Sequence, residues 1–96
     1  MNISEYIQCK MPGTIRAHRQ DEGTLIGLPF PYTVPCAETH FNELYYWDTF
    51  FTNKGLFLLG MIEQAKNNVC DILFLIEKFG YMPNGNRTYL TQRSQP

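Results

Sequence analysis

Two short segments of this 96-residue chain carry side chains that together could recognise a sugar. Trp47 and Asp48 are adjacent in a candidate helix, Asn84 lies in an Asn-Gly turn, and Arg93 and Gln95 follow shortly after. An aromatic ring can stack against the C–H face of a pyranose, and carboxylate, amide and guanidinium groups can bind its hydroxyls. The two segments therefore predict a site for sugar-like rings.

Each of these residues also has a purely structural interpretation. A helical tryptophan such as Trp47 commonly belongs to a core, and Asp48 in a first helical turn is stabilised by the helix dipole. An Asn-Gly pair at Asn84 is first of all a turn signal, and an arginine such as Arg93 is mostly solvated. A structural helical protein therefore stays open as an alternative to a sugar-binding one.

The composition narrows the choice of partners and cofactors. Lys and Arg total 8 against 9 Asp and Glu, a net charge of −1, and no basic stripe indicates nucleic acid. No charged run suggests a membrane surface, and apolar runs such as "LFLLGMI" are too short to span a bilayer. We therefore expect neither nucleic acid nor membrane as a partner.

The cysteines point away from metal chemistry. Cys9, Cys36 and Cys70 form no CxxC pair and no metal-ligand spacing, so neither a metal nor a cofactor is expected. The start of the chain lacks the basic and apolar regions of a secretory signal. Reduced thiols and a cytoplasmic location are the expectation from this cysteine usage.

Apolar spacing predicts two helices joined by a short turn. The first runs from about 43 to 59, with apolar-face positions Trp47, Phe50, Phe51, Gly55 and Leu58. The second runs from Ile62 to Phe79, with apolar positions Ile62, Ala65, Val69, Ile72, Leu73, Ile76 and Phe79. Gly60 marks the end of the first helix or a tight connection, and Gly80 is typical of the residue just past a helix. The expected product is an antiparallel αα-hairpin and an all-α fold.

The rest of the chain divides around this hairpin. Residues 1–23 are a polar lead-in in which "ISEYI" suggests a short helix, and 24–41 are an extended connector rich in proline. The hairpin occupies 43–79, and a loop with turn chemistry occupies 80–96. Some apolar residues lie outside the two stripes, namely Phe57, Leu59, Phe74 and Leu75. Helices that are apolar on more than one side usually pack against neighbours on more than one side. A larger helical domain, or self-association with a second copy, would supply those neighbours.

The motifs "ELYYWD" (43–48), "PNGNRTY" (83–89) and "RSQP" (93–96) resemble those of the trehalase family of glycoside hydrolases. "LPFPYTVP" (28–35) is similar to the stretch that leads into them. The resemblance implies an α/α toroid of six hairpins, with this chain as an N-terminal segment of the catalytic domain. It also implies a glucose subsite lined by Trp47, Asp48, Asn84, Arg93, Ser94 and Gln95.

One stretch departs from the family pattern. Where the family has Pro-Gly-Gly-Arg-Phe, this chain reads "PCAETHF" (35–41), and His40 takes the place nearest to the missing arginine. A histidine cannot reproduce a bidentate guanidinium contact, so we expect an altered glucose subsite. The implied partner is a small carbohydrate, either trehalose or a related α-glucoside.

The resemblance also implies inverting hydrolysis by an acid and a base carboxyl group, which in the family lie beyond the region matching Pro96. Glu43 and Asp48 are poor substitutes, because five residues on a helix place them about 140° apart. We therefore expect no catalytic residue in this chain and no turnover by the isolated chain. A non-catalytic sugar-binding or structural helical fragment is the alternative.

Overall fold

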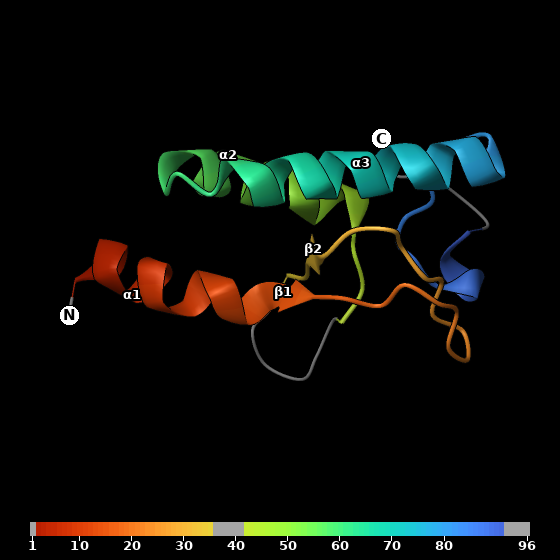
Figure 1. Cartoon of the computed structure of the whole chain (residues 1–96), viewed down its shortest axis with the longest axis horizontal. Helices are drawn as coiled ribbons and strands as arrows, with labels where there is room; N and C mark the ends of the chain where they lie inside the picture. Colours follow the sequence, from red (N-terminus) through yellow and green to blue (C-terminus); the bar gives the residue numbers. More distant parts are fainter. Residues whose placement is uncertain (1, 36–41, 92–96) are drawn as a thin grey trace.

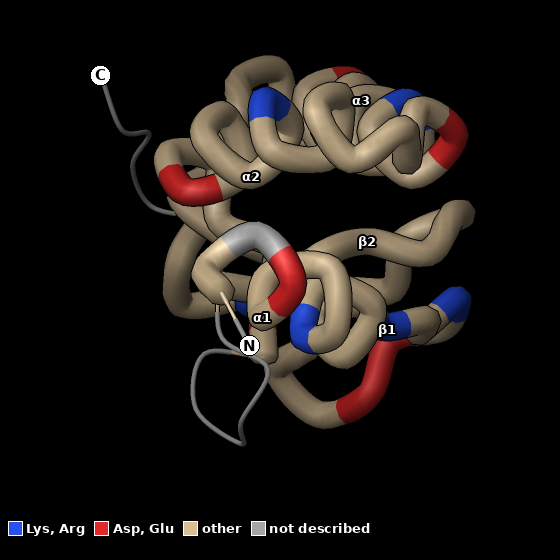
Figure 2. The backbone as a smooth tube through the Cα atoms, turned by 90° about the vertical axis from the view of Figure 1, so that its left-hand side faces the viewer, with Lys and Arg blue, Asp and Glu red and all other residues tan. Residues whose placement is uncertain are grey.

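The computed structural model describes residues 2–35 and 42–91. Along these stretches the elements are α1 (Ile3–Lys10), a 3₁₀ turn η1 (Met11–Thr14), β1 (Ile15–Arg16), β2 (Tyr32–Thr33), α2 (Tyr46–Leu58), α3 (Ile62–Phe79) and a 3₁₀ turn η2 (Thr88–Leu90). Helices α2 and α3 form one layer, and α1 and β1 lie in a second layer beneath them (Figure 1). Figure 2 shows the same two layers from the end of the molecule. The described part is mainly helical, as predicted.

Helices α2 and α3 contact each other and run in opposite directions (Figure 1). Gly60 in the connection has φ +78° and Gly80 after α3 has φ +82°, both in the left-handed region that favours glycine. The Gly80 N–H donates to the carbonyl of Ile76, which closes the end of α3. The bounds of α3 agree with those that the apolar spacing predicts.

Helix α2 begins at Tyr46, three residues later than predicted. The Leu44 N–H donates to Oδ1 of Asn86 at 2.8 Å, and Tyr45 forms an antiparallel bridge with Gly85. These contacts with a distant segment hold 44–45 in an extended conformation. The helix therefore starts where the pairing ends.

A short ribbon and the connector cover the inner face of α3. Strands β1 and β2 pair antiparallel, with Ile15 opposite Thr33. The main apolar core lies between the connector, the residues before α2 and the inner face of α3, and consists of Ile26, Leu28, Tyr32, Val34, Leu44, Leu75 and Met82. The extended connector thus belongs to the folded core.

The buried residues of α3 share only Ala65 with the apolar stripe predicted from the sequence. They are Gln64, Ala65, Asn68, Asp71 and Leu75. Polar residues of α3 are buried against the connector because the extended backbone of the connector needs hydrogen-bond partners. Asn68 accepts from the Thr33 N–H at 3.0 Å and donates to the Thr33 hydroxyl at 2.8 Å, while Gln64 donates to the Pro31 carbonyl at 2.8 Å. Polar side chains therefore occupy much of the inner face.

Large apolar side chains remain exposed on the outer faces of both helices. On α2 they are Trp47, Phe50, Phe51, Phe57 and Leu58, and on α3 they are Ile62, Val69, Leu73 and Ile76. Most of each predicted apolar stripe thus lies at the surface. Within 2–35 and 42–91, no helix combines the length and apolar character needed to cross a bilayer.

Candidate functional site

The two motif segments meet at the start of α2. The Tyr46 N–H donates to the carbonyl of Asn84 at 3.1 Å, next to the bridge between Tyr45 and Gly85. Trp47 and Asp48 follow in the first turn of the helix. Segments far apart in the chain are thereby brought to one end of α2.

Trp47 and Asp48 are both exposed. The Trp47 side chain is 52% accessible and makes an edge-on contact with Phe51, with ring centroids 6.2 Å apart. The core interpretation of this tryptophan therefore does not hold in the described part of the chain. Asn84 is half-buried beside this turn. Their role as sugar ligands stays a prediction.

The other predicted site residues lie outside the described residues. They are His40, Arg93, Ser94 and Gln95. The structure therefore places Trp47, Asp48 and Asn84 and leaves the rest of the predicted subsite as an expectation.

A partly buried ion pair beside the site was not predicted. Arg87 Nε donates to Glu43 Oε2 at 2.8 Å, and Arg87 Nη1 donates to the Thr24 hydroxyl at 3.0 Å. The Tyr45 hydroxyl donates to Glu43 Oε1 at 2.8 Å. Burial first, and then this hydrogen bond, raise the pKa of Tyr45 above its ordinary value. The only sequence signal was that Glu43 and Arg87 each stand inside one of the two motifs.

This ion pair also bears on the two acidic residues of "ELYYWD". Glu43 precedes α2, is buried and is bound by Arg87, whereas Asp48 is exposed within the helix. The prediction that both lie on one helix is wrong for Glu43. The conclusion that they do not form a catalytic pair is unchanged, because Glu43 is engaged elsewhere.

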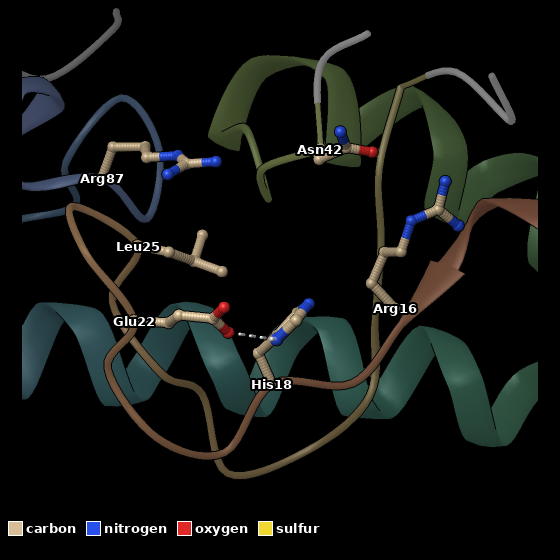
Figure 3. Close-up of a pocket in the computed structure, with 6 residues that line it drawn as sticks. All are labelled: Arg16, His18, Glu22, Leu25, Asn42 and Arg87. Atoms are coloured by element: carbon tan, nitrogen blue, oxygen red, sulfur yellow. Dashed lines mark ion pairs between the residues drawn. The ribbon is translucent and has the colours of Figure 1, made fainter. Parts of the chain in front are cut away.

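A polar cavity of about 270 Å³ lies beside Arg87 (Figure 3). It is lined by Arg16, His18, Glu22, Leu25, Asn42 and Arg87. His18 Nδ1 lies 3.7 Å from Glu22 Oε2. Trp47, Asp48 and Asn84 do not line this cavity, and no Trp, Tyr or Phe is among the described residues that line it. The described lining residues therefore offer a sugar no large aromatic ring to stack on.

Asp71 on α3 is a buried carboxyl group away from the motif segments. Its Oδ1 accepts from the Phe30 N–H at 3.0 Å, and its Oδ2 has no hydrogen-bond partner among the described residues. Burial raises its pKa to about 7, although the bond from Phe30 acts in the opposite direction. Asp71 thus holds the connector. No group of three or more His, Cys, Asp or Glu residues suited to a metal occurs within 2–35 and 42–91.

Comparison with known proteins extends the family resemblance over nearly the whole chain. The family model described as Trehalase matches residues 3–96. The chain is 38% identical over 96 residues to a periplasmic trehalase of Xanthomonas axonopodis pv. citri (strain 306), covering 98% of this chain and 16% of that protein. It is 44% identical over 80 residues to a probable trehalase of Oryza sativa subsp. japonica, covering 83% of this chain and 14% of that protein.

A third relative, a trehalase of Arabidopsis thaliana, is 39% identical over 90 residues, covering 94% of this chain and 14% of that protein. This chain thus spans about a sixth or less of the length of these relatives. The expected cytoplasmic location is contradicted, because several of the most similar bacterial relatives are named periplasmic trehalases. Cys9 and Cys70 are free and exposed, but reduced thiols do not identify a compartment. By its family match and these identities, the chain belongs to the trehalase family.

Proposed function

We propose that this chain forms one wall of the glucose subsite of a glycosidase that acts on trehalose or a related α-glucoside. The observation that carries the proposal is the hydrogen bond from Tyr46 to Asn84, which joins the two motif segments at one surface. An exposed indole, an exposed carboxylate and an amide then lie around one helix end. The names of the relatives give the substrate class its support.

Each side chain has a role in this proposal. The sugar ring stacks on Trp47, Asp48 accepts hydrogen bonds from hydroxyls, and the Asn84 amide both donates and accepts. The Asp48 carboxylate lies in the first turn of α2 and offers two acceptor oxygens. Arg93, Ser94, Gln95 and His40 complete the shell in this proposal.

Hydrolysis requires more than these groups. An inverting glycosidase needs two carboxyl groups that admit a water between them, and Glu43 is already bound to Arg87. We therefore assign substrate binding to this chain and catalysis, with inversion, to other parts of the longer protein. The division into lead-in, connector, hairpin and loop, within a six-hairpin toroid, is part of the same proposal.

Sugar binding by the 96-residue chain provides the first test. We expect millimolar binding of trehalose by titration calorimetry, weakened about tenfold by Trp47→Ala or Asp48→Asn, since each loses contacts of more than about 1 kcal/mol. Glu63→Gln is the matched control for Asp48→Asn, because Glu63 is an exposed carboxylate in the first turn of α3. Equal binding by the Trp47 variant and the wild-type chain would contradict the proposal.

Turnover provides the second test. The isolated chain should release no glucose from trehalose. A chimera carrying this chain in place of the matching 16% of the Xanthomonas axonopodis periplasmic trehalase should release glucose. In that chimera, Asp48→Asn should lower kcat/KM by at least about tenfold, and Glu63→Gln should not. Glucose release by the isolated chain would contradict the assignment of catalysis to other parts of the protein.

A further inference from the structure

Asn86 connects three parts of the fold through one buried side chain. It has no accessible surface. Its Nδ2 donates to the Ile26 carbonyl at 3.0 Å, and its Oδ1 accepts from the Leu44 N–H at 2.8 Å. Its own carbonyl accepts from the Ile26 N–H at 2.8 Å. Both ends of the carboxamide are used, so a side chain that lacks either a donor or an acceptor cannot replace it.

The segment around Asn86 lies between two other extended segments. On one side Arg87 forms an antiparallel bridge with Leu25, and on the other side Gly85 forms one with Tyr45. Asn86 stands between these two bridges in the sequence. Its carboxamide therefore sets the spacing between the connector and the residues that enter α2.

The ion pair of Glu43 and Arg87 stabilises the same junction, at which the connector, the residues before α2 and the segment around Asn86 meet. Its side chains are 9% and 23% exposed, and the Nε to Oε2 distance is 2.8 Å. Arg87 also reaches Thr24 in the connector. The ion pair and the Asn86 carboxamide thus connect the same segments from neighbouring positions.

We infer that Asn86 is a positioning residue for the proposed sugar subsite: its buried carboxamide fixes Asn84 against the turn that carries Trp47 and Asp48. Asn86 cannot touch a ligand itself, because it is fully buried. It acts through Leu44 and the bridge beside it, which determine where α2 begins. The choice of trehalose as the ligand rests on the proposed function. The contacts by which Asn86 positions the start of α2 do not depend on it.

The chain offers a matched control for a substitution at Asn86. Asn68 is also a fully buried asparagine and also hydrogen-bonds to the connector, but it does so from the middle of α3. Asn68→Ala and Asn86→Ala each leave buried backbone groups without a partner, so both should lower stability by similar amounts. Only Asn86→Ala should disturb the proposed subsite.

The first experiment measures the dissociation constant of trehalose by NMR titration, at a temperature where spectra show both variants folded. Asn86→Ala should weaken binding by about tenfold or more, whereas Asn68→Ala should leave it within about twofold. Equal dissociation constants for Asn86→Ala and wild type, or an equal loss in both variants, would overturn the inference.

A second measurement needs no sugar and separates this inference from the proposed function. The resonances of the Trp47 indole N–H and the Asn84 amide should shift in ligand-free Asn86→Ala and stay in place in Asn68→Ala. If wild type binds no trehalose but these shifts occur, the proposed function fails and the positioning role stands. Unshifted resonances would overturn the positioning role.

If Asn86→Ala does not fold, Glu43→Gln gives the same test in milder form. Glutamine has about the same size as glutamate and keeps one acceptor oxygen, but it cannot form the ion pair with Arg87. It should shift the same two resonances and weaken trehalose binding by about threefold. The absence of both effects in Glu43→Gln would contradict the positioning role of this junction.

Discussion

Asp71 shows how one buried side chain can both hold a segment and limit stability. Its carboxyl group accepts a hydrogen bond from Phe30, which helps to fix the connector on α3. It is fully buried, and burial raises its pKa from 3.8 to about 7. The fold therefore prefers the neutral form of this group.

The pH dependence of stability follows from this pKa. Between pH 3.8 and about 7 the unfolded chain has lost the Asp71 proton and the folded chain retains it, so the free energy of unfolding falls as pH rises. Above about pH 7 this contribution levels off. Asp71→Asn keeps an acceptor for Phe30 without the charge and should be more stable than wild type at about pH 8, by on the order of 4 kcal/mol, with little difference at about pH 3.

Urea unfolding followed by Trp47 fluorescence at both pH values measures this difference. Trp47 is the single tryptophan of the chain, so the signal has one source. Glu77→Gln, an exposed carboxylate on the same helix, is the control and should leave the pH profile unchanged. Parallel profiles for Asp71→Asn and wild type would show that Asp71 does not limit stability.

The connector is the element on which the arrangement of the others depends. Its backbone hydrogen-bonds to Gln64, Asn68 and Asp71 of α3 and to Asn86 of the C-terminal loop. It also packs tightly against the preceding residues, where the Leu28 N–H donates to the His18 carbonyl at 2.7 Å. This close approach needs a residue without a side chain.

Gly27 supplies that residue, and its replacement tests the packing of the connector. A Cβ at Gly27 would lie 2.6 Å from the backbone carbon of Gln20 and 2.7 Å from that of Arg19. We expect Gly27→Ala to lower the free energy of unfolding by more than about 2 kcal/mol, because backbone atoms must move.

Gly60→Ala is the control for this substitution. A Cβ at Gly60 meets nothing within 4 Å, so the cost should be only the strain of its positive φ, about 1 kcal/mol. Thermal unfolding by circular dichroism compares the two variants. A smaller loss for Gly27→Ala than for Gly60→Ala would contradict the tight packing.

The molecule as a whole has an apolar outer surface that single-chain packing does not explain. The residues Val69, Leu73 and Ile76 are 46%, 57% and 37% exposed, and their spacing places them on one face of α3. Such a surface commonly marks an interface. The relatives are far longer than this chain, so we propose that further helices of a longer protein cover it. For the isolated chain we propose that a second copy takes that place.

Self-association of the isolated chain follows from this proposal. Sedimentation should show an average mass that rises with protein concentration, because apolar area is buried between copies. The double substitution Leu73→Lys and Ile76→Lys should keep the chain monomeric over the same range. Glu63→Lys and Glu77→Lys together place lysines at exposed positions outside the stripe and serve as the control. A monomeric wild-type chain at all concentrations would rule out a second copy as the cover.

Local features and the family can be read from neighbouring residues in the sequence. Apolar spacing predicts the bounds of α3, because helical periodicity is a property of neighbouring residues, and Gly80 marks its end. The motifs at 43–48 and 83–89 identify the family, which the match over 3–96 confirms. The two segments that meet at the site can therefore be recognised from their residues alone.

Contacts between distant segments determine which face of each helix is buried and how the two motifs are joined. Asn68 and Asp71 face inward because the connector brings unpaired backbone groups to α3, and apolar spacing carries no information about that demand. The bonds from Asn86 to Leu44 and to Ile26 join residues 42 and 60 positions apart. Such pairings depend on where distant segments meet in space, which the pattern of neighbouring residues does not specify.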